Sequence, residues 1–193
     1  MRRTVGGLAV ALVAALGSTV AAAPAQATPL RPVPQLALDR YLGLWYQLAA
    51  NPAPFNIDCV RDTTAYYTQI DERNVRVENS CTTVTGERRR VVGNARVNDT
   101  AALHVSFPSA PFQDSLDGPS NYIVAYLADD YSWALVGDPT RVSGFVLSRS
   151  PNVDAASWKQ IREVVEREGY NSCLMLTSPT TEGMQQIRPL CTV

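Results

Sequence analysis

Eight short segments with the composition of β-strands follow one another along most of this chain. Turn-forming residues separate them, and short loops such as 71–74 and 128–130 allow neighbours to pair as an antiparallel meander. A sheet of eight strands can close on itself, which removes its exposed edges and leaves an interior for one small ligand. The sequence therefore predicts an all-β fold, an eight-stranded antiparallel up-and-down barrel. The predicted strands cover residues 44–49, 63–70, 75–79, 91–97, 102–107, 121–128, 132–137 and 144–148.

Residues 1–27 have the features of a secretory signal peptide. Arg2 and Arg3 precede an apolar run rich in Ala and Val, which ends in the small-residue motif Ala25-Gln26-Ala27. We expect cleavage after Ala27, and residues 21–23 offer an earlier alternative. The apolar run is short for a membrane-spanning helix, and no Cys follows the expected cleavage site to carry a lipid. The sequence therefore predicts a secreted protein without a stable membrane anchor.

The rest of the chain has the length of a single domain. Residues 28–40 contain several prolines and predict an extended, loosely held N-terminal arm, whereas residues 41–193 are expected to form the barrel domain. After the last predicted strand, apolar residues recur at helical spacing, and Gly169 provides a stop. This pattern predicts one C-terminal helix that packs outside the barrel through Trp158, Ile161, Val164 and Val165.

Four cysteines follow the signal peptide, an even number that predicts disulfides in an oxidising compartment. Three pairings are possible. Cys59 and Cys81 flank a predicted hairpin, and Cys173 and Cys191 flank the C-terminal segment, so sequential pairing closes two local loops. We favour this local pairing, in which each bridge stabilises the fold by about 2 to 4 kcal/mol.

Three sequence elements, taken in order, resemble the signature of the lipocalin family, in particular its bacterial and apolipoprotein D-like branch. They are Gly43-Leu44-Trp45-Tyr46, the run 131–139 that ends in Gly137-Asp138-Pro139, and Leu147-Ser148-Arg149. The resemblance extends from Tyr41 to the C-terminus. It implies a cup-shaped barrel that carries a small apolar molecule.

The resemblance also implies how the closed end of the cup is built. Trp45 and Arg149 are expected to pack as a cation–π pair that seals the floor and touches no ligand. Asp138 and Pro139 suit a tight turn. Related lipocalins also suggest a competing disulfide, Cys59 with Cys191, which would tie the C-terminal tail across the barrel. The local pairing and this alternative both remain open from the sequence.

Period-two alternation assigns an inward face to each strand if Trp45 points into the barrel. Charged residues then face outward, together with His104. Aromatic rings on the inward face suit an apolar ligand, and Tyr67, Tyr122 and Asn79 are placed to orient it through hydrogen bonds. The residues expected to line the cavity are Tyr67, Val77, Asn79, Val105, Phe107, Tyr122, Val124, Trp133, Leu135 and Phe145.

Several other classes of function find little support in the sequence. The only histidine, His104, is predicted to face outward, so a Ser-His-Asp or Cys-His catalytic site and an axial haem ligand are not expected. We expect no cofactor and no metal, since the cysteines form no Cys-x-x-Cys pair. The basic run 88–90 lies beside Glu87 in a chain of formal net charge −1, which argues against binding to nucleic acid.

The sequence therefore predicts a secreted, monomeric binding protein or carrier for a small hydrophobic molecule such as a lipid, fatty acid, steroid or isoprenoid. One alternative is an enzyme with the same fold, in which Tyr67 or Tyr122 donates a proton to a bound lipid. A second alternative is a protein-interaction or inhibitor module. It would act through the long loop 108–119, because long ordered loops are often functional.

Overall fold

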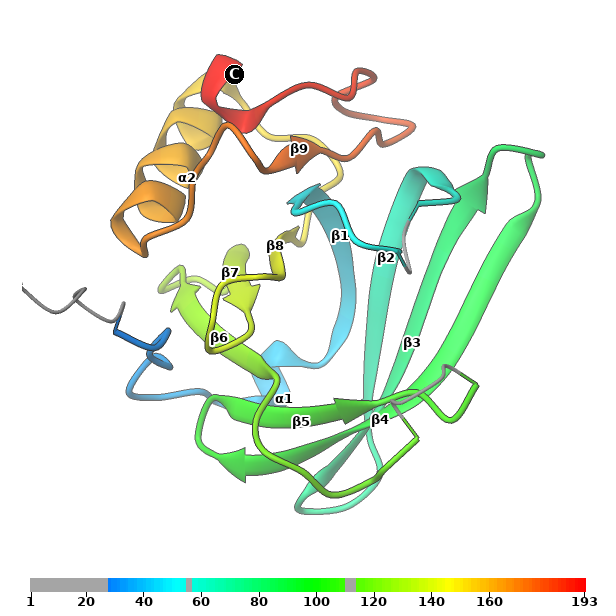
Figure 1. Ribbon diagram of the computed structural model, residues 1–193, viewed down its shortest axis with the longest axis vertical. Coiled ribbons are helices and arrows are strands. Elements are labelled where there is room, and N and C mark those ends of the chain that lie inside the picture. The colour runs from blue at the N-terminus through cyan, green and yellow to red at the C-terminus, as the bar shows by residue number, and fades with distance from the viewer. Residues whose placement is uncertain (1–27, 55–56, 110–113) are drawn as a thin grey trace, which may run out of the picture.

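The computed structural model describes residues 28–54, 57–109 and 114–193, and the expected signal peptide lies outside these ranges. Eight antiparallel strands pair in sequence order, and β1 pairs with both β8 and β2, so the sheet closes into a barrel (Figure 1). The predicted fold class is confirmed. The strands are β1 Gly43–Ala50, β2 Cys59–Gln69, β3 Asn74–Thr83, β4 Arg88–Asp99, β5 Ala102–Ser106, β6 Tyr122–Leu127, β7 Trp133–Gly137 and β8 Gly144–Ser148.

Strands β2, β3 and β4 extend farther toward the open end of the barrel than the sequence predicts. Hydrophobic alternation stops there, and charged or hydroxyl side chains stabilise the outer face instead. Arg88 donates from Nη2 to Ser80 Oγ at 2.7 Å. Glu78 lies between two arginines, at 3.1 Å from Arg76 Nη1 and 2.7 Å from Arg90 Nε. The basic run 88–90 thus forms part of a strand.

The closed end of the barrel is held by one guanidinium, as the sequence predicts. Arg149 Cζ lies 3.8 Å from the ring centre of Trp45, whose side chain is fully buried. Arg149 also donates to three backbone carbonyls, from Nη1 to Leu44 at 2.6 Å and from Nη2 to Arg40 at 2.7 Å and Leu42 at 2.8 Å. Gly43 enters β1 with φ +89°, a conformation that favours glycine, and so lets the chain pass this close to Arg149.

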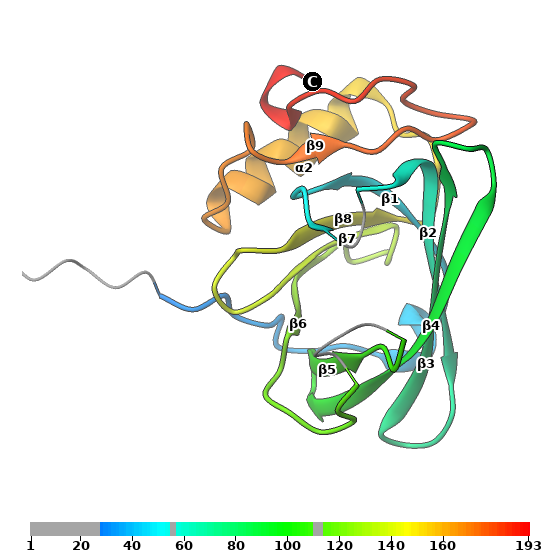
Figure 2. The ribbon, with the colours of Figure 1, turned by 45° about the vertical axis from the view of Figure 1, so that its right-hand side comes forward.

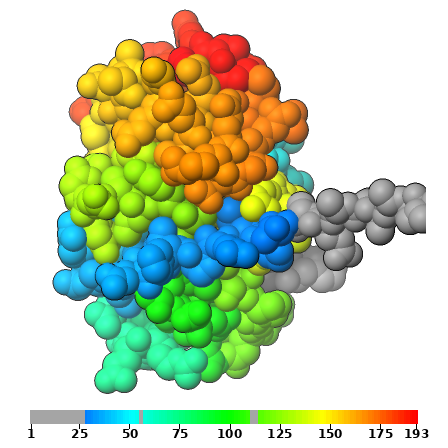
Figure 3. Space-filling model, turned by 90° about the vertical axis from the view of Figure 1, so that its left-hand side faces the viewer, coloured from blue at the N-terminus to red at the C-terminus, as the bar shows by residue number. Residues whose placement is uncertain are grey.

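The N-terminal arm is not loosely held. Leu30 is buried and its N–H donates to Pro139 O at 3.0 Å, while Val33 N–H donates to Val124 O at 2.8 Å. Figure 3 shows the arm in blue, lying across the wall of the barrel. The prolines favour the extended form, and the apolar residues between them give the arm a surface to bury. The arm leads into the short helix α1, Leu38–Tyr41.

A single long helix, α2 (Ala155–Arg167), covers one side of the barrel (Figure 2). Asp154 caps it by accepting from Ser157 N–H at 2.8 Å. The predicted apolar stripe packs against outward residues of the barrel, including Trp133 and Val146. In the described ranges, no helix is long and apolar enough to cross a membrane.

The loop between β7 and β8 contains the predicted turn. Asp138 Oδ1 accepts from Thr140 N–H at 2.7 Å, and Asp138 Oδ2 accepts from Ser143 N–H at 2.5 Å. Tyr170 packs beside Gly137 and donates to Ser143 O at 3.0 Å. The signature residues Gly137, Asp138 and Pro139 therefore shape this loop.

Both disulfides are local, Cys59 with Cys81 and Cys173 with Cys191. The favoured pairing is confirmed, and the competing pairing of Cys59 with Cys191 is wrong for this chain. The second bridge joins the residues that follow α2 to the short helix η2, Leu190–Thr192. Each cysteine therefore pairs with a near neighbour in the sequence, and not in the pattern that related lipocalins suggest.

The C-terminal segment completes the wall of the barrel near its open end. β1 pairs with β2 only over Gly43–Tyr46, and beyond that point β9 (Leu176–Thr177) pairs with β1 instead. Asp62 then joins β2 to this segment, because its N–H donates to Pro179 O at 2.8 Å and its carboxylate accepts from Thr181 N–H at 2.6 Å. The tail therefore fills the space between two barrel strands.

We expect Arg149→Lys to destabilise the protein by about 2 kcal/mol. Lysine keeps the charge but lacks the planar fork that reaches three carbonyls and stacks on the indole. Urea denaturation measures the change. Arg90→Lys is the matched control, because its exposed ion pair with Glu78 contributes no more than about 1 kcal/mol. Equal losses in the two variants would contradict a special role for Arg149.

Candidate functional site

The interior of the barrel holds a cluster of packed apolar and aromatic side chains, which is the candidate binding site. Seven of the ten predicted lining residues belong to this cluster or pack against it, and no buried side chain among the described residues is charged. The predicted residues found in the cluster or packed against it are Tyr67, Val77, Val105, Phe107, Tyr122, Val124 and Phe145.

Asn79 also faces inward, as predicted. It pairs across the sheet with Ala65, a member of the interior cluster. Its side-chain oxygen Oδ1 is buried and has no hydrogen-bond partner among the described residues. Buried polar atoms are usually paired, so this oxygen is available to a donor on a ligand.

Trp133 and Leu135 do not line the cavity, and this part of the prediction is wrong. Both belong to the outer cluster beneath α2, where the Trp133 ring lies 4.5 Å from the ring of Tyr126. The β7 residues that face inward are Ala134 and Val136. All of β7 is buried, on one face by the barrel interior and on the other by the helix. Hydrophobicity therefore does not show which side chains of this strand face the interior and which face the helix.

Three tyrosines from separate elements meet inside the barrel, above the floor. Tyr122 of β6 lies in the middle, with its hydroxyl 2.8 Å from that of Tyr41 and 2.9 Å from that of Tyr67. Tyr41 also rests on the floor, since its ring lies 4.9 Å from that of Trp45. We call Tyr41, Tyr67 and Tyr122 the tyrosine cluster. Tyr41 was not among the predicted lining residues, and the sequence signal for it is its position two residues before the Gly-x-Trp motif.

Burial keeps the tyrosine cluster uncharged. Removal from water raises the pKa of Tyr67 to about 12. The pKa values of Tyr41 and Tyr122 are raised well above the ordinary value, first by burial and then by the neighbouring phenols. At neutral pH the cluster therefore presents hydroxyl groups that donate and accept hydrogen bonds but do not ionise.

Little free space lies beside the tyrosine cluster. A cavity of about 10 Å³ is bounded by the three tyrosines, by leucines of the arm and α1, and by apolar residues of β3, β4 and β5. This is about the room that one water molecule needs. Nearer the open end, Gly93 leaves space for Phe107, whose ring atom Cδ1 would lie 2.6 Å from a Cβ at this position. A ligand must therefore displace side chains to reach the floor.

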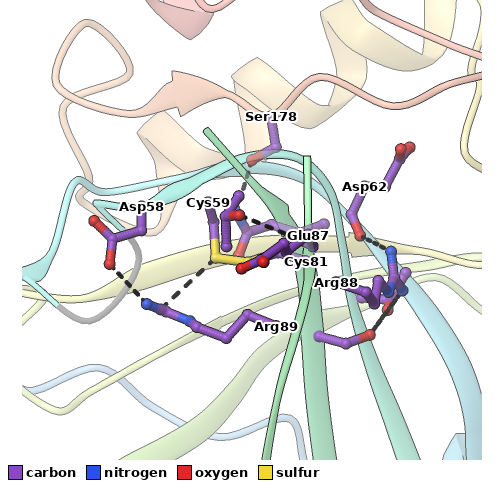
Figure 4. The surroundings of a disulfide bond; sticks show 12 residues. Asp58, Cys59, Asp62, Cys81, Glu87, Arg88, Arg89 and Ser178 are labelled. Atoms are coloured by element: carbon purple, nitrogen blue, oxygen red, sulfur yellow. Dashed lines mark hydrogen bonds and ion pairs between the residues drawn. A yellow bond between two sulfur atoms is a disulfide. The ribbon is translucent and has the colours of Figure 1, made fainter. Parts of the chain in front are cut away.

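Arg89 lies at the open end of the interior, and its charge is paired. Arg89 is opposite Cys81 in the β3–β4 ladder. Figure 4 shows its guanidinium beside the first disulfide, with Nη1 at 2.9 Å from Asp58 Oδ2 and Nη2 at 3.9 Å from Cys59 Sγ. A ligand that enters the barrel therefore passes an arginine whose positive charge is already paired with a carboxylate.

His104 lies outside the interior, as predicted. Its ring nitrogens contact the carbonyls of Pro119 and Ser115 at 2.9 and 3.0 Å, so the ring fastens the loop between β5 and β6 to the barrel. In the described ranges, no group of three or more His, Cys, Asp or Glu side chains is arranged to hold a metal ion.

The raised pKa values of the tyrosine cluster predict a loss of stability in alkali. Below about pH 10 the phenols are neutral in both the folded and the unfolded chain, so stability is unaffected. Above that pH the unfolded chain releases protons that the folded chain retains, and the free energy of unfolding falls until the pH passes the folded pKa, about 12 for Tyr67.

Urea denaturation between about pH 9 and about pH 12 measures this effect. Tyr67→Phe should reduce the slope of unfolding free energy against pH by about 1.4 kcal/mol per pH unit, the effect of one proton. Tyr66→Phe, on the exposed outer face of the same strand, provides the baseline. An unchanged slope in Tyr67→Phe would contradict the inferred burial of its phenol.

Comparisons with known proteins agree with this architecture. A family model described as a lipocalin-like domain matches residues 36–180. Temperature-induced lipocalin-1 of Arabidopsis thaliana is 32% identical over 151 residues, which cover 76% of this chain and 81% of that protein. The outer membrane lipoprotein Blc of Citrobacter freundii is 33% identical over 137 residues, which cover 68% of this chain and 72% of that protein.

A solved structure shows the same fold at lower identity. Insecticyanin from the tobacco hornworm Manduca sexta superposes with a TM-score of 0.57 at 13% identity, over 84% of this chain and 92% of that chain. The closed barrel, the Trp45–Arg149 floor and the match over most of the sequence lead to one conclusion: the chain belongs to the lipocalin family.

Proposed function

We propose that this protein is a secreted carrier that binds one small hydrophobic molecule inside its barrel. The observation that carries the proposal is the apolar and aromatic cluster inside a closed barrel, sealed at one end by Trp45 and Arg149. Apolar side chains there favour the burial of an apolar ligand, and the tyrosine cluster and Asn79 supply polar groups to orient it. The lipocalin fold supports the same function.

The proposal includes movement of side chains at the open end. The free space beside the tyrosine cluster is about 10 Å³, so a lipid-sized molecule cannot fit without displacing side chains. Phe107 and Val105 are only partly buried and pack at the margin of the interior cluster. Their displacement would open a continuous path from the loops toward the floor.

Secretion is part of the proposal. Two disulfides suit an oxidising compartment, and the N-terminal sequence resembles an export signal. We also propose that the chain belongs to the bacterial and apolipoprotein D-like branch, a proposal that its 33% identity with the Citrobacter protein supports. That relative is named as an outer membrane lipoprotein, whereas our proposal for this chain is a free protein.

We propose binding without catalysis. The enzyme alternative needs Tyr67 or Tyr122 to give up a proton, and burial makes both phenols weaker acids. His104, the residue best suited to acid–base chemistry at neutral pH, lies on the outside with both ring nitrogens against carbonyl oxygens.

One observation favours the interaction module as a second candidate. The four loops at the open end each expose a large aliphatic side chain, and together these could contact a protein partner. The residues are Ile57, Val84, Leu116 and Val142, which are 57% to 78% exposed. A protein that binds no apolar probe but loses a partner when these residues are changed would fit this candidate.

Titration with an environment-sensitive apolar probe, followed by competition with lipids, tests the carrier proposal. We expect saturable binding at one site per chain. Phe107→Glu places a charge in the interior and should weaken binding at least about tenfold, because that charge must be desolvated when the ligand binds. Val92→Glu is the matched control, since Val92 precedes Gly93 on β4 and is exposed on the outer face.

Circular dichroism and the Tm of both variants establish that they are folded. Equal probe affinity in Phe107→Glu, Val92→Glu and the wild type would place the probe outside the barrel and overturn the proposal.

A further inference from the structure

The tyrosine cluster contains one more hydrogen-bond donor than it can use. Each of its three phenols carries one O–H hydrogen. Among the described residues, the hydroxyls make two hydrogen bonds, both at Tyr122. Whichever way these two bonds point, one of the three hydroxyl hydrogens has no acceptor. The unused donor faces the cavity, because all three tyrosines line it.

Asn79 provides an unused acceptor on the same interior surface. Its buried Oδ1 has no partner among the described residues. Along β3, Asn79 lies two residues beyond Val77, which pairs with Tyr67. Two residues of a strand span about 7 Å and point to the same face. The interior thus presents a spare donor in the tyrosine cluster and a spare acceptor on Asn79, which lies nearer the open end of β3 than Val77.

Among the described residues, the two arginines that lie beside the interior are already engaged by groups of the protein. Arg149, whose charge reaches Tyr41 and Tyr67, donates to three backbone carbonyls and stacks on Trp45. Arg89, at the open end, is paired with Asp58. An ionised carboxylate inside the barrel would therefore lose its hydration without gaining an ion pair.

We infer that the barrel selects uncharged lipids that carry a hydrogen-bond-accepting oxygen, such as long-chain ketones, esters or alcohols, over fatty acid anions and plain hydrocarbons. The ligand oxygen accepts the unused hydrogen of the tyrosine cluster, and a ligand hydroxyl or N–H placed farther along the chain donates to Asn79 Oδ1. The inference rests on the proposed function and narrows its ligand class.

Titration of the purified protein with an alkane, a methyl ketone and a fatty acid of matched chain length tests this selectivity at about pH 8. The ketone should bind about tenfold more tightly than the alkane, which is the effect expected of one hydrogen bond. It should also bind at least about tenfold more tightly than the fatty acid. A fatty acid or an alkane that binds as well as the ketone would overturn the inference while leaving the proposed function intact.

Removal of hydroxyl groups tests the count of donors. The triple variant Tyr41→Phe, Tyr67→Phe, Tyr122→Phe keeps the rings and should bind the ketone no better than the alkane. Each single variant still leaves at least one hydroxyl hydrogen without an acceptor, so each should keep a preference for the ketone. Tyr66→Phe, outside the barrel, controls for the loss of a phenol.

A preference for the ketone that survives in the folded triple variant would overturn the assignment of the donor. If the triple variant does not fold, the wild-type series still decides the selectivity. Failure of every ligand to bind the wild type would instead overturn the proposed function, and the inference with it.

Discussion

The contact between Arg149 and the backbone before and within β1 holds the rest of the barrel in place. Arg149 follows the last barrel strand, and its guanidinium bonds to the carbonyls of Arg40, Leu42 and Leu44, which lead into and begin the first. The same group stacks on Trp45, and the Trp45 indole donates to Tyr41 O at 2.8 Å. Arginine suits this position because its donors are fixed in one plane and its face can stack on a ring. The position of Tyr41, and through it the tyrosine cluster, depends on this contact.

Much of the fold could be predicted because it depends on local patterns. Hydrophobic alternation along the strands predicted the barrel, and the spacing of the cysteines favoured the two disulfides that are found. Alternation failed on β7, where both faces are buried and the larger residues point toward the helix. Tyr41 could not be found in this way, because a short helix rather than a strand directs it into the barrel. The close packing beside the tyrosines is also a property of the folded chain, since it depends on where the arm and α1 lie.

The interior combines dense packing with incomplete hydrogen bonding. Leucines of the arm and α1 fill the lower part of the barrel so well that space for about one water molecule remains. Packing for stability alone would favour apolar groups at every inward position, because an unpaired buried polar atom is unfavourable. Asn79 and the tyrosine cluster are exceptions, because each places a polar group without a hydrogen-bond partner inside the barrel. Such departures are expected where a protein meets a ligand.

The C-terminal segment completes the barrel wall between β1 and β2 and follows all eight barrel strands in the sequence. The wall at this place consists of residues 176–181, close to the end of the chain, paired with a strand that begins at Gly43. A chain still emerging from the ribosome lacks this segment, and its first two barrel strands are joined at one end only. The part of the wall between β1 and β2 near the open end is therefore complete only after residues 176–181 have been made. The eight strands that close the sheet through the β8–β1 and β1–β2 pairs all precede this segment, so closure of the sheet and insertion of the tail are separate events.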